Sequence, residues 1–313
     1  LEAFASQPYA RIATSYAAPN NHIFHSLLVR LSTRSLGKDN WTARLPALAA
    51  GVISIPVIWV VGRALCGTTA AGLLAAWILA LMPVHLHYSQ TSRGYSLLML
   101  LALLSLWAAH SGLRRGRRLS WTAFGVCSFL MAWTIPSGIF HLLALTLWAA
   151  LLTSGPSRRS PILTGLLSSA LVLLAYLPVW QGLASAGQRW GVDVWQDPLA
   201  LVGVFHLAVD GWIGGWSGLL PAIAAVAGLA GMTRNHRETG LYIVLSWSVA
   251  CAAALAMGVA GQPRTYFFLL PTFVLAAAYG LCRTVNADRW RAVAVTALLA
   301  GYGWVEIRAL GNA

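Results

Sequence analysis

The chain has 313 residues, of which 58% are hydrophobic and only 9% are charged. Its net charge of +13 would indicate a nucleic-acid partner in a soluble protein, but its mean hydropathy of +0.69 is typical of a membrane protein. We therefore exclude nucleic acid as a partner and expect membrane lipid around the chain. The predicted fold class is all-α, a polytopic bundle of transmembrane helices, because a helix satisfies its own backbone hydrogen bonds in lipid.

Residues 1–43 are too polar to cross a membrane. Hydrophobic residues at helical spacing predict short amphipathic helices at 3–17 and 22–35, separated by the break at Pro19-Asn20-Asn21. Such helices can lie in the membrane interface, so we predict an outer loop of interfacial helices that caps the bundle. A surface helical hairpin without a catalytic role is the alternative.

Residues 44–313 contain recurring apolar runs of roughly 17–25 residues, the length that crosses a bilayer as a helix. They predict about ten spans and leave one long outer loop, at 184–215. The expected spans are 44–65, 69–84, 94–112, 119–135, 138–153, 161–180, 216–232, 239–260, 267–285 and 292–308.

Basic residues cluster in alternate connections between these spans, as in Arg114-Arg115-Gly116-Arg117-Arg118. By the positive-inside rule these connections face the cytoplasm, which places a multi-pass protein in the cytoplasmic (inner) membrane with its site facing the periplasm or exterior. The opposite side holds five of the eight carboxylates: Glu2, Asp39, Asp193, Asp197 and Asp210. Because the chain starts at Leu1 in an outer loop, we expect at least one further span before it.

A polar cluster lies at the edge of the second expected span, from His85 to Ser96. Its Arg93, and Arg264 near the last outer connection, lie on the outer side against the basic bias. A guanidinium donates a planar fork of hydrogen bonds, so these two arginines are candidates to bind a phosphate. The alternative for each is an interfacial arginine that reaches lipid headgroups.

Among the outer carboxylates, Glu2 is a candidate general base, a group that can take a proton from a reacting hydroxyl. A solvated loop carboxylate is the alternative for Glu2. His22, His85 and His87 are candidates to hold a divalent metal ion beside Glu2, with hydrogen-bonding histidines as the alternative. Tryptophans and carboxylates in 184–215 are consistent with sugar binding or with anchoring of that loop in lipid.

Five elements in order resemble a known family. They are Leu1-Glu2-Ala3-Phe4, Pro19-Asn20-Asn21-His22, Arg44-Leu45-Pro46-Ala47, Tyr88-Ser89-Gln90 with Arg93-Gly94-Tyr95-Ser96, and Pro263-Arg264-Thr265-Tyr266. This order resembles the protein O-mannosyltransferase-like and aminoarabinose-transferase-like glycosyltransferases of the GT-C fold. The resemblance implies an inverting membrane glycosyltransferase that moves a hexose or pentose from a polyprenyl-phosphate-linked donor to a glycan, lipid or protein acceptor.

The family's first outer loop usually opens with an Asp-Glu pair, and here Leu1 stands where the aspartate would be. Glu2 has taken over the role of base, or truncation has altered this end, or the protein does not catalyse. With the resemblance, Tyr266 joins Arg93 and Arg264 as a candidate for the donor phosphate. The candidates for the rest of the substrate are Asn20, Asn21, His22, His87, Tyr88, Gln90 and Tyr95.

A transporter or lipid flippase is the rival class, and a non-catalytic membrane scaffold is a third. A transporter is expected to carry ionisable groups at mid-membrane. In this chain the charges lie almost wholly at span ends, with His110 and His141 as the nearest exceptions. The transferase hypothesis makes a geometric prediction, that Glu2, Asn21, His22, residues 85–95 and Arg264 converge on one outer cavity.

Overall fold

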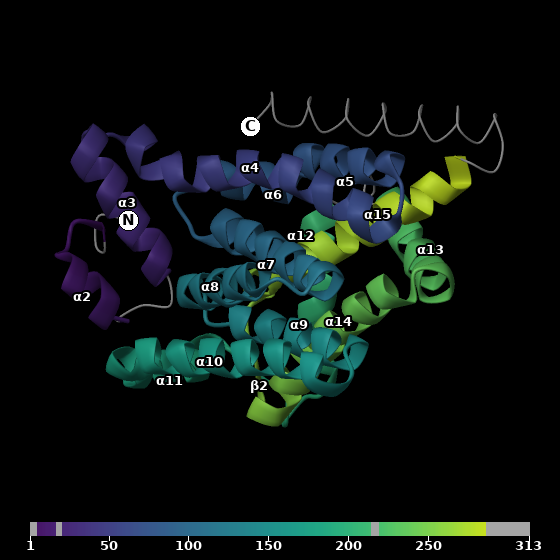
Figure 1. The fold of residues 1–313 in the computed structure, drawn as a ribbon. Helices are drawn as coiled ribbons and strands as arrows, with labels where there is room; N and C mark the ends of the chain where they lie inside the picture. The colour runs from purple at the N-terminus through teal and green to yellow at the C-terminus, as the bar shows by residue number, and fades with distance from the viewer. Residues whose placement is uncertain (1–4, 17–20, 214–218, 286–313) are drawn as a thin grey trace.

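The structure, a computed structural model, describes residues 5–16, 21–213 and 219–285. These residues are almost entirely helical, and the helices pack side by side in one bundle (Figure 1). The all-α class is therefore confirmed. Glu2, Asn20 and the expected span at 292–308 lie outside the described residues.

Two short helices, α2 (Tyr9–Thr14) and α3 (Ile23–Leu36), lie at one end of the bundle (Figure 1, left). Helix α3 packs against α4 and α8 and matches its expected range closely, whereas α2 is shorter than expected. The Arg30 guanidinium lies 4.9 Å from the ring centre of Tyr9 and joins the two helices.

Helices α4 (Asn40–Cys66), α5 (Thr69–Leu81) and α6 (Pro83–Gln90) follow. The expected span at 69–84 is broken, because α5 and α6 are bent by 60° at Met82. Met82 precedes a proline, which disfavours helical backbone, and its ψ of 122° is extended. The polar cluster therefore begins on a separate helix and not in a connector.

The remaining long helices follow the predicted spans closely. They are α7 (Tyr95–Arg115), α8 (Arg118–Thr134), α9 (Gly138–Leu152), α10 (Arg159–Tyr176), α13 (Leu219–Asn235), α14 (Arg237–Met257) and α15 (Leu270–Val285), with 3-10 turns at Gly155–Arg158, Leu177–Val179 and Pro263–Leu269 (η4). In the most apolar stretch of α7, 78% of the residues are buried, and in that of η4 with α15, 94% are buried. These two form the core, while the apolar face of α10 is exposed, as on a lipid-facing helix.

The segment 184–215, which we predicted as an outer loop, has regular secondary structure. It contains the end of α11 (Trp180–Trp190) and all of β1 (Val192–Asp193) and α12 (Leu199–Ile213). Strand β1 pairs antiparallel with β2 (Val259–Ala260). Helix α12 has only 15 residues and is too short to be recognised as a span.

Five helices in the described part of the chain are long and apolar enough to cross a membrane, or six if α5 and α6 form one bent span. The count of ten stays a prediction. The bundle has two distinct ends. Arg114 pairs with Glu238 at one end, and Ser137 Oγ donates to the Thr265 carbonyl at the other. Helix α7 runs between them, so the basic connections lie far from the 91–94 turn.

Candidate functional site

The turn between α6 and α7 connects the N-terminal segment to the bundle. The backbone N–H of Gly94 donates to Nδ1 of His22 at 2.8 Å. A Cβ on Gly94 would lie 2.8 Å from Thr134 Cγ2 and 2.9 Å from His22 Cβ, so only glycine permits this approach. Ser92 Oγ also donates to the Ala43 carbonyl and ties the turn to α4. The sequence Arg93-Gly94-Tyr95 therefore positions His22.

Four of the predicted substrate residues form a continuous row of aromatic rings. The ring centroids are 5.1 Å apart for His87 and Tyr88, 4.4 Å for Tyr88 and Tyr95, and 4.9 Å for Tyr95 and His22. The row connects the end of α6, the start of α7 and the residue before α3. Segments that are distant in the sequence thus meet at this end of the bundle.

Arg93 and Arg264 reach the same point from different segments. Both act electrostatically on His22, Tyr88 and Tyr95, although one follows α6 and the other lies in η4. The one ion pair that the structure describes is at the opposite end, so neither guanidinium has a carboxylate partner among those residues. Two unpaired guanidinium groups at one place favour an anionic ligand.

His22 is a hydrogen-bond donor at this place. Its burial, with smaller contributions from His25, Arg93 and Arg264, lowers the pKa of His22 to about 3, so the ring is neutral at ordinary pH. Because Nδ1 accepts from Gly94, the ring proton lies on Nε2. His22 lines a cavity and presents to it an N–H group.

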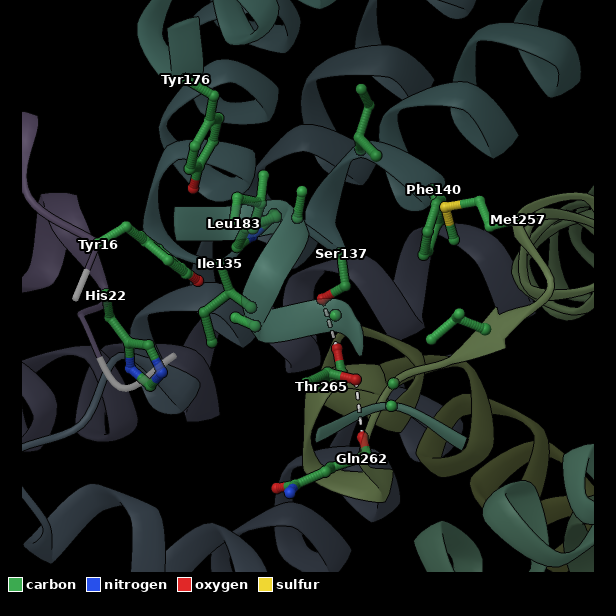
Figure 2. A pocket seen from close by; sticks show the side chains of 18 of the residues that line it. Tyr16, His22, Ile135, Ser137, Phe140, Tyr176, Leu183, Met257, Gln262 and Thr265 are labelled. Atoms are coloured by element: carbon green, nitrogen blue, oxygen red, sulfur yellow. Dashed lines mark hydrogen bonds between the residues drawn. The ribbon is translucent and has the colours of Figure 1, made fainter. Parts of the chain in front are cut away.

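That cavity, which we call the apolar cavity, has a volume of about 660 Å³. Figure 2 shows Tyr16 and His22 on one side of it, Phe140 and Met257 on the opposite side, and Thr265 below. Most of the remaining wall is apolar and comes from α10, α11 and the connection between α8 and α9. Arg264 lines it together with Tyr95, so one end is polar and cationic and the rest is apolar.

Comparison with known proteins decides the family. Residues 20–181, more than half of the chain, match the family model described as dolichyl-phosphate-mannose-protein mannosyltransferase. The chain belongs to this mannosyltransferase family. The crystal structure of ArnT from Cupriavidus metallidurans in the apo state matches with a TM-score of 0.58 and 14% identity, over 92% of this chain. No curated protein matches the chain.

The match with ArnT concerns the fold, and this chain spans 57% of the length of that protein. It confirms the GT-C type of helical bundle, and with the family match it confirms the resemblance on which the sequence analysis relied. The matched range 20–181 contains His22, the row of rings and Arg93, so the site lies mostly in the part that defines the mannosyltransferase family.

Two predicted site residues are occupied by contacts within the protein. Asn21 Nδ2 donates to the carbonyls of Ile12 and Ser15, and its Oδ1 accepts from Ser26. Asn21 thus holds the segment that presents His22. Tyr266 is 1% exposed, and its hydroxyl accepts from the Gly261 N–H. Tyr266 therefore supports the loop before Arg264 and does not line the apolar cavity.

The other predicted residues separate into two groups. Tyr88 lines a smaller cavity of about 480 Å³ that shares Arg264 with the apolar cavity. His87 and Gln90 line a third cavity, beside α3 and the start of α4. Residues 85–95 thus do not face one cavity as expected, but form a wall that several cavities share. Glu2 and Asn20 lie outside the described residues.

In the described part of the chain, no three His, Cys, Asp or Glu side chains are grouped so that they could hold a metal ion. His85 Nε2 faces the Gly51 carbonyl at 3.3 Å, on the α4 side of α6. His87 is on the other side, next to Tyr88. Their spacing of two on a helix separates them.

Several lining residues of the apolar cavity were not among the predicted site residues. Tyr16 and Tyr176 meet edge to face at 6.4 Å, and burial, with the nearby Tyr95, raises the pKa of Tyr16 to about 12. Ser137 and Thr265 are joined by a hydrogen bond of 2.6 Å (Figure 2). A single tyrosine or serine in an apolar sequence gives no signal of its place in a site.

Two of the three carboxylates of 184–215, Asp193 and Asp197, accept hydrogen bonds from the backbone. Asp193 accepts from the N–H groups of Trp195 and Gln196, and Asp197 accepts from that of Leu199 at the start of α12. The indole N–H of Trp195 donates to the Leu255 carbonyl. These contacts shape the segment that closes one side of the apolar cavity.

Proposed function

We propose that the chain is a membrane glycosyltransferase that takes its sugar from a polyprenyl-phosphate-linked donor. The proposed acceptor is a glycan, lipid or protein at the outer face of the cytoplasmic membrane. Family membership supports transfer of a sugar from a lipid phosphate, since the family is described by a dolichyl-phosphate-linked donor. The apolar cavity and the residues around it support the more specific parts of the proposal.

The apolar cavity carries this proposal. A polyprenyl phosphate has a long apolar chain and a charged head, and the cavity combines an apolar wall with Arg264 at one end. Arg93 acts on the same side chains as Arg264. As the sugar leaves the donor, negative charge grows on the phosphate, and fixed guanidinium and N–H donors stabilise that charge. The Nε2–H of His22 is a third donor at this end.

In the proposed reaction, an acceptor hydroxyl attacks the anomeric carbon from the face opposite the phosphate. The bond from that carbon to the phosphate oxygen breaks, and its electron pair leaves with the lipid phosphate. Glu2 takes the hydroxyl proton. A single displacement of this kind inverts the anomeric configuration, for a hexose or a pentose. Glu2 belongs to the first outer loop, which the described part of the chain continues as α2 and α3.

The charge distribution supports the proposed orientation. The end of the bundle with Arg114 and Glu238 also carries the basic connections, as expected for the cytoplasmic side. The apolar cavity is at the opposite end of α7. A multi-pass protein of the inner membrane would thus have its site at the outer leaflet.

The rival class, a transporter or flippase, is expected to have ionisable groups at mid-membrane that bind substrate or ions. His141 is buried, but it contacts the Ala102 carbonyl and packs against Tyr242 and Phe268. These contacts are those of a core residue, so no specific observation favours transport.

The first test is the binding of undecaprenyl phosphate to the purified full chain, read as an increase in thermal stability. The proposal expects Arg264→Gln to weaken this binding by about 10–100-fold, because a charge-assisted hydrogen bond is lost. Arg264→Lys keeps the charge without the fork and should weaken it markedly too. Arg117→Gln, an exposed cation at the other end, is the matched control.

Two outcomes would contradict the proposal. If undecaprenyl phosphate does not stabilise the parent protein, the apolar cavity is not a donor site. If Arg264→Lys binds and transfers as well as the parent, while only the glutamine variant fails, Arg264 is a local charge and not a specific phosphate ligand.

A further inference from the structure

A second large cavity lies beside the apolar one, between α3, the start of α4 and the end of α6. Its volume is about 1260 Å³, nearly twice that of the apolar cavity. We call it the basic cavity because of its charged lining residues, which are Arg30, Arg34, Lys38, Asp39 and Arg44. None of these residues belongs to the donor site proposed above.

Positive charge dominates the basic cavity, with four cations against the single carboxylate of Asp39. Asp39 forms no ion pair with them among the described residues, where Arg114 and Glu238 make the one pair present. The four cations also lie at the end of the bundle opposite the basic connections. The positive-inside rule does not account for cations on that side, which favours a role in binding.

The walls of the basic cavity are fixed by hydrogen bonds. Ser32 Oγ donates to the Thr42 carbonyl, which holds α3 against α4. Arg30 Nη1 donates to the Ala5 and Ser6 carbonyls, at 3.3 and 2.9 Å. Its Nε is buried without a hydrogen-bond partner among the residues that the structure places. The guanidinium is thus held in position with a donor unused.

The two cavities share one wall. Thr91 and Ser92 line the basic cavity, and Tyr95, three residues later, lines the apolar cavity. The row of rings from His87 through Tyr88 and Tyr95 to His22 crosses this wall. Only this wall would therefore separate a ligand in the basic cavity from a lipid phosphate held by Arg93 and Arg264.

We propose that the basic cavity binds the acceptor, and that this acceptor is an anionic glycan or glycolipid headgroup that carries phosphate or carboxylate groups. The inference rests on the proposed transferase function. An acceptor must reach the donor sugar from a neighbouring site, and the shared wall provides that arrangement. Arginine side chains from two helices suit oxyanions, which they bind through paired hydrogen bonds.

The cavity size favours a headgroup of several sugars over a single ion. Sites for small molecules usually enclose roughly 300–1,000 Å³, and this cavity is larger. Its cations come from α3, the connection at 37–39 and α4, and they line one hollow. Arginines that only contact lipid headgroups would need no such enclosure.

The test uses the full chain in nanodiscs of phosphatidylcholine, with tetragalacturonate and glucose 1,6-bisphosphate as anionic probes and maltotetraose as the neutral one. The parent should bind at least one anionic probe about tenfold or more tightly than maltotetraose at low salt, with weaker binding as salt rises. The double variant Arg34→Gln/Arg44→Gln should lose about tenfold in that affinity. Arg117→Gln/Arg118→Gln removes the same charge from the other end and should have no effect. The probe that binds distinguishes carboxylate from phosphate.

The proposal is overturned if maltotetraose binds as tightly as both anionic probes, or if the double variant keeps the parent's affinity for them. Phosphatidylglycerol, an anionic lipid, is added to the nanodiscs as a further probe. The proposal is also overturned if the double variant binds phosphatidylglycerol less tightly than the parent but binds both anionic glycan probes equally well. Stabilisation by undecaprenyl phosphate is measured in the same samples. Its retention in the double variant shows a folded donor site, and its absence from the parent counts against the proposed function separately.

Discussion

The apolar cavity and the basic cavity lie on two sides of the same turn, but their lining residues differ in polarity and charge. The apolar cavity is enclosed mainly by α10, α11 and other spanning helices, with cations only at the end near Arg264. The basic cavity is enclosed by α3 and the start of α4 and is lined by four cations. A lipid phosphate matches the first lining, and a hydrated anion matches the second.

The difference shows how one short turn can serve two ligands of opposite character. Residues 91–92 face the basic cavity, Arg93 reaches toward His22 and Tyr95, and Gly94 brings His22 against the turn. For reaction, the hydroxyl of one ligand must reach the anomeric carbon of the other past the edge of this wall. Variants that affect one cavity, both, or only the chemistry can therefore break or sharpen the comparison.

The largest effect is expected for Glu2→Gln, which removes the candidate base and changes no described lining residue of either cavity. We predict that turnover falls on the order of 10²–10⁴-fold, while undecaprenyl phosphate and anionic probes bind as before. Transfer assays and binding assays on the same protein measure the two separately. Glu238→Gln, at the opposite end of the bundle, is the matched control.

Near-normal transfer by Glu2→Gln would place the base elsewhere. Asp39 is then the next candidate, since it is the carboxylate of the basic cavity. Asp39→Asn should in that case cause the loss that Glu2→Gln did not. The comparison would change, because the basic cavity would then supply chemistry as well as binding.

The fold was largely predictable because hydropathy and length specify spanning helices directly. Helix α4, α7 and α14 begin and end within a few residues of the expected spans. The prediction missed the features for which length gave no signal. Helix α12 is too short to be recognised, and the bend at Met82 depends on the conformation that Pro83 imposes on its neighbour.

The site was predictable only in part. The motif order identified His22, Tyr95, Arg93 and Arg264, which the structure brings together. It did not show that Asn21 is occupied by the carbonyls of its own loop. Nor did the sequence indicate the basic cavity, because its cations become one surface only when α3 folds back against α4.

The next effect tests the shared wall itself. Gly94→Ala would place a Cβ within 3 Å of Thr134 and His22 in a buried turn. Overpacking of this kind costs about 1–3 kcal/mol, so we predict a lower melting temperature and weaker binding at both cavities. Gly203→Ala, whose Cβ would meet nothing within 4 Å, is the control and should change neither. Unchanged stability and binding in Gly94→Ala would show that the turn is not a rigid wall.

A smaller and more selective effect is expected for Gly187→Trp. Gly187 lines the apolar cavity, and a Cβ added there would have no other atom within 4 Å. The indole of a tryptophan can therefore extend into the cavity without displacing the backbone. We predict about a tenfold loss of undecaprenyl phosphate affinity, because the added ring occupies space for the prenyl chain. Binding of anionic glycan probes should not change. Gly203→Trp is the control, and equal losses at both cavities would contradict the proposed separation.

A further effect concerns the loss of stability in acid. Burial lowers the pKa of His22 to about 3 and that of His25 to about 4, from an ordinary value of 6.5. The unfolded chain therefore binds protons at pH values where the native rings stay neutral. The stability that the neutral rings contribute is complete above pH 6.5 and is lost as pH falls toward 3. Each histidine changes the folding equilibrium by up to about tenfold per pH unit.

His22→Asn should make this loss shallower between pH 6.5 and 4. The asparagine Oδ1 can still accept from the Gly94 N–H, but no ring is left to titrate beside Arg93 and Arg264. The free energy of unfolding, measured in detergent across this range, provides the test, with the exposed His206→Asn as control. If His22→Asn and the parent lose stability with the same slope, His22 is not the buried neutral ring that the apolar cavity requires. The difference between the two cavities would then rest on their arginines alone.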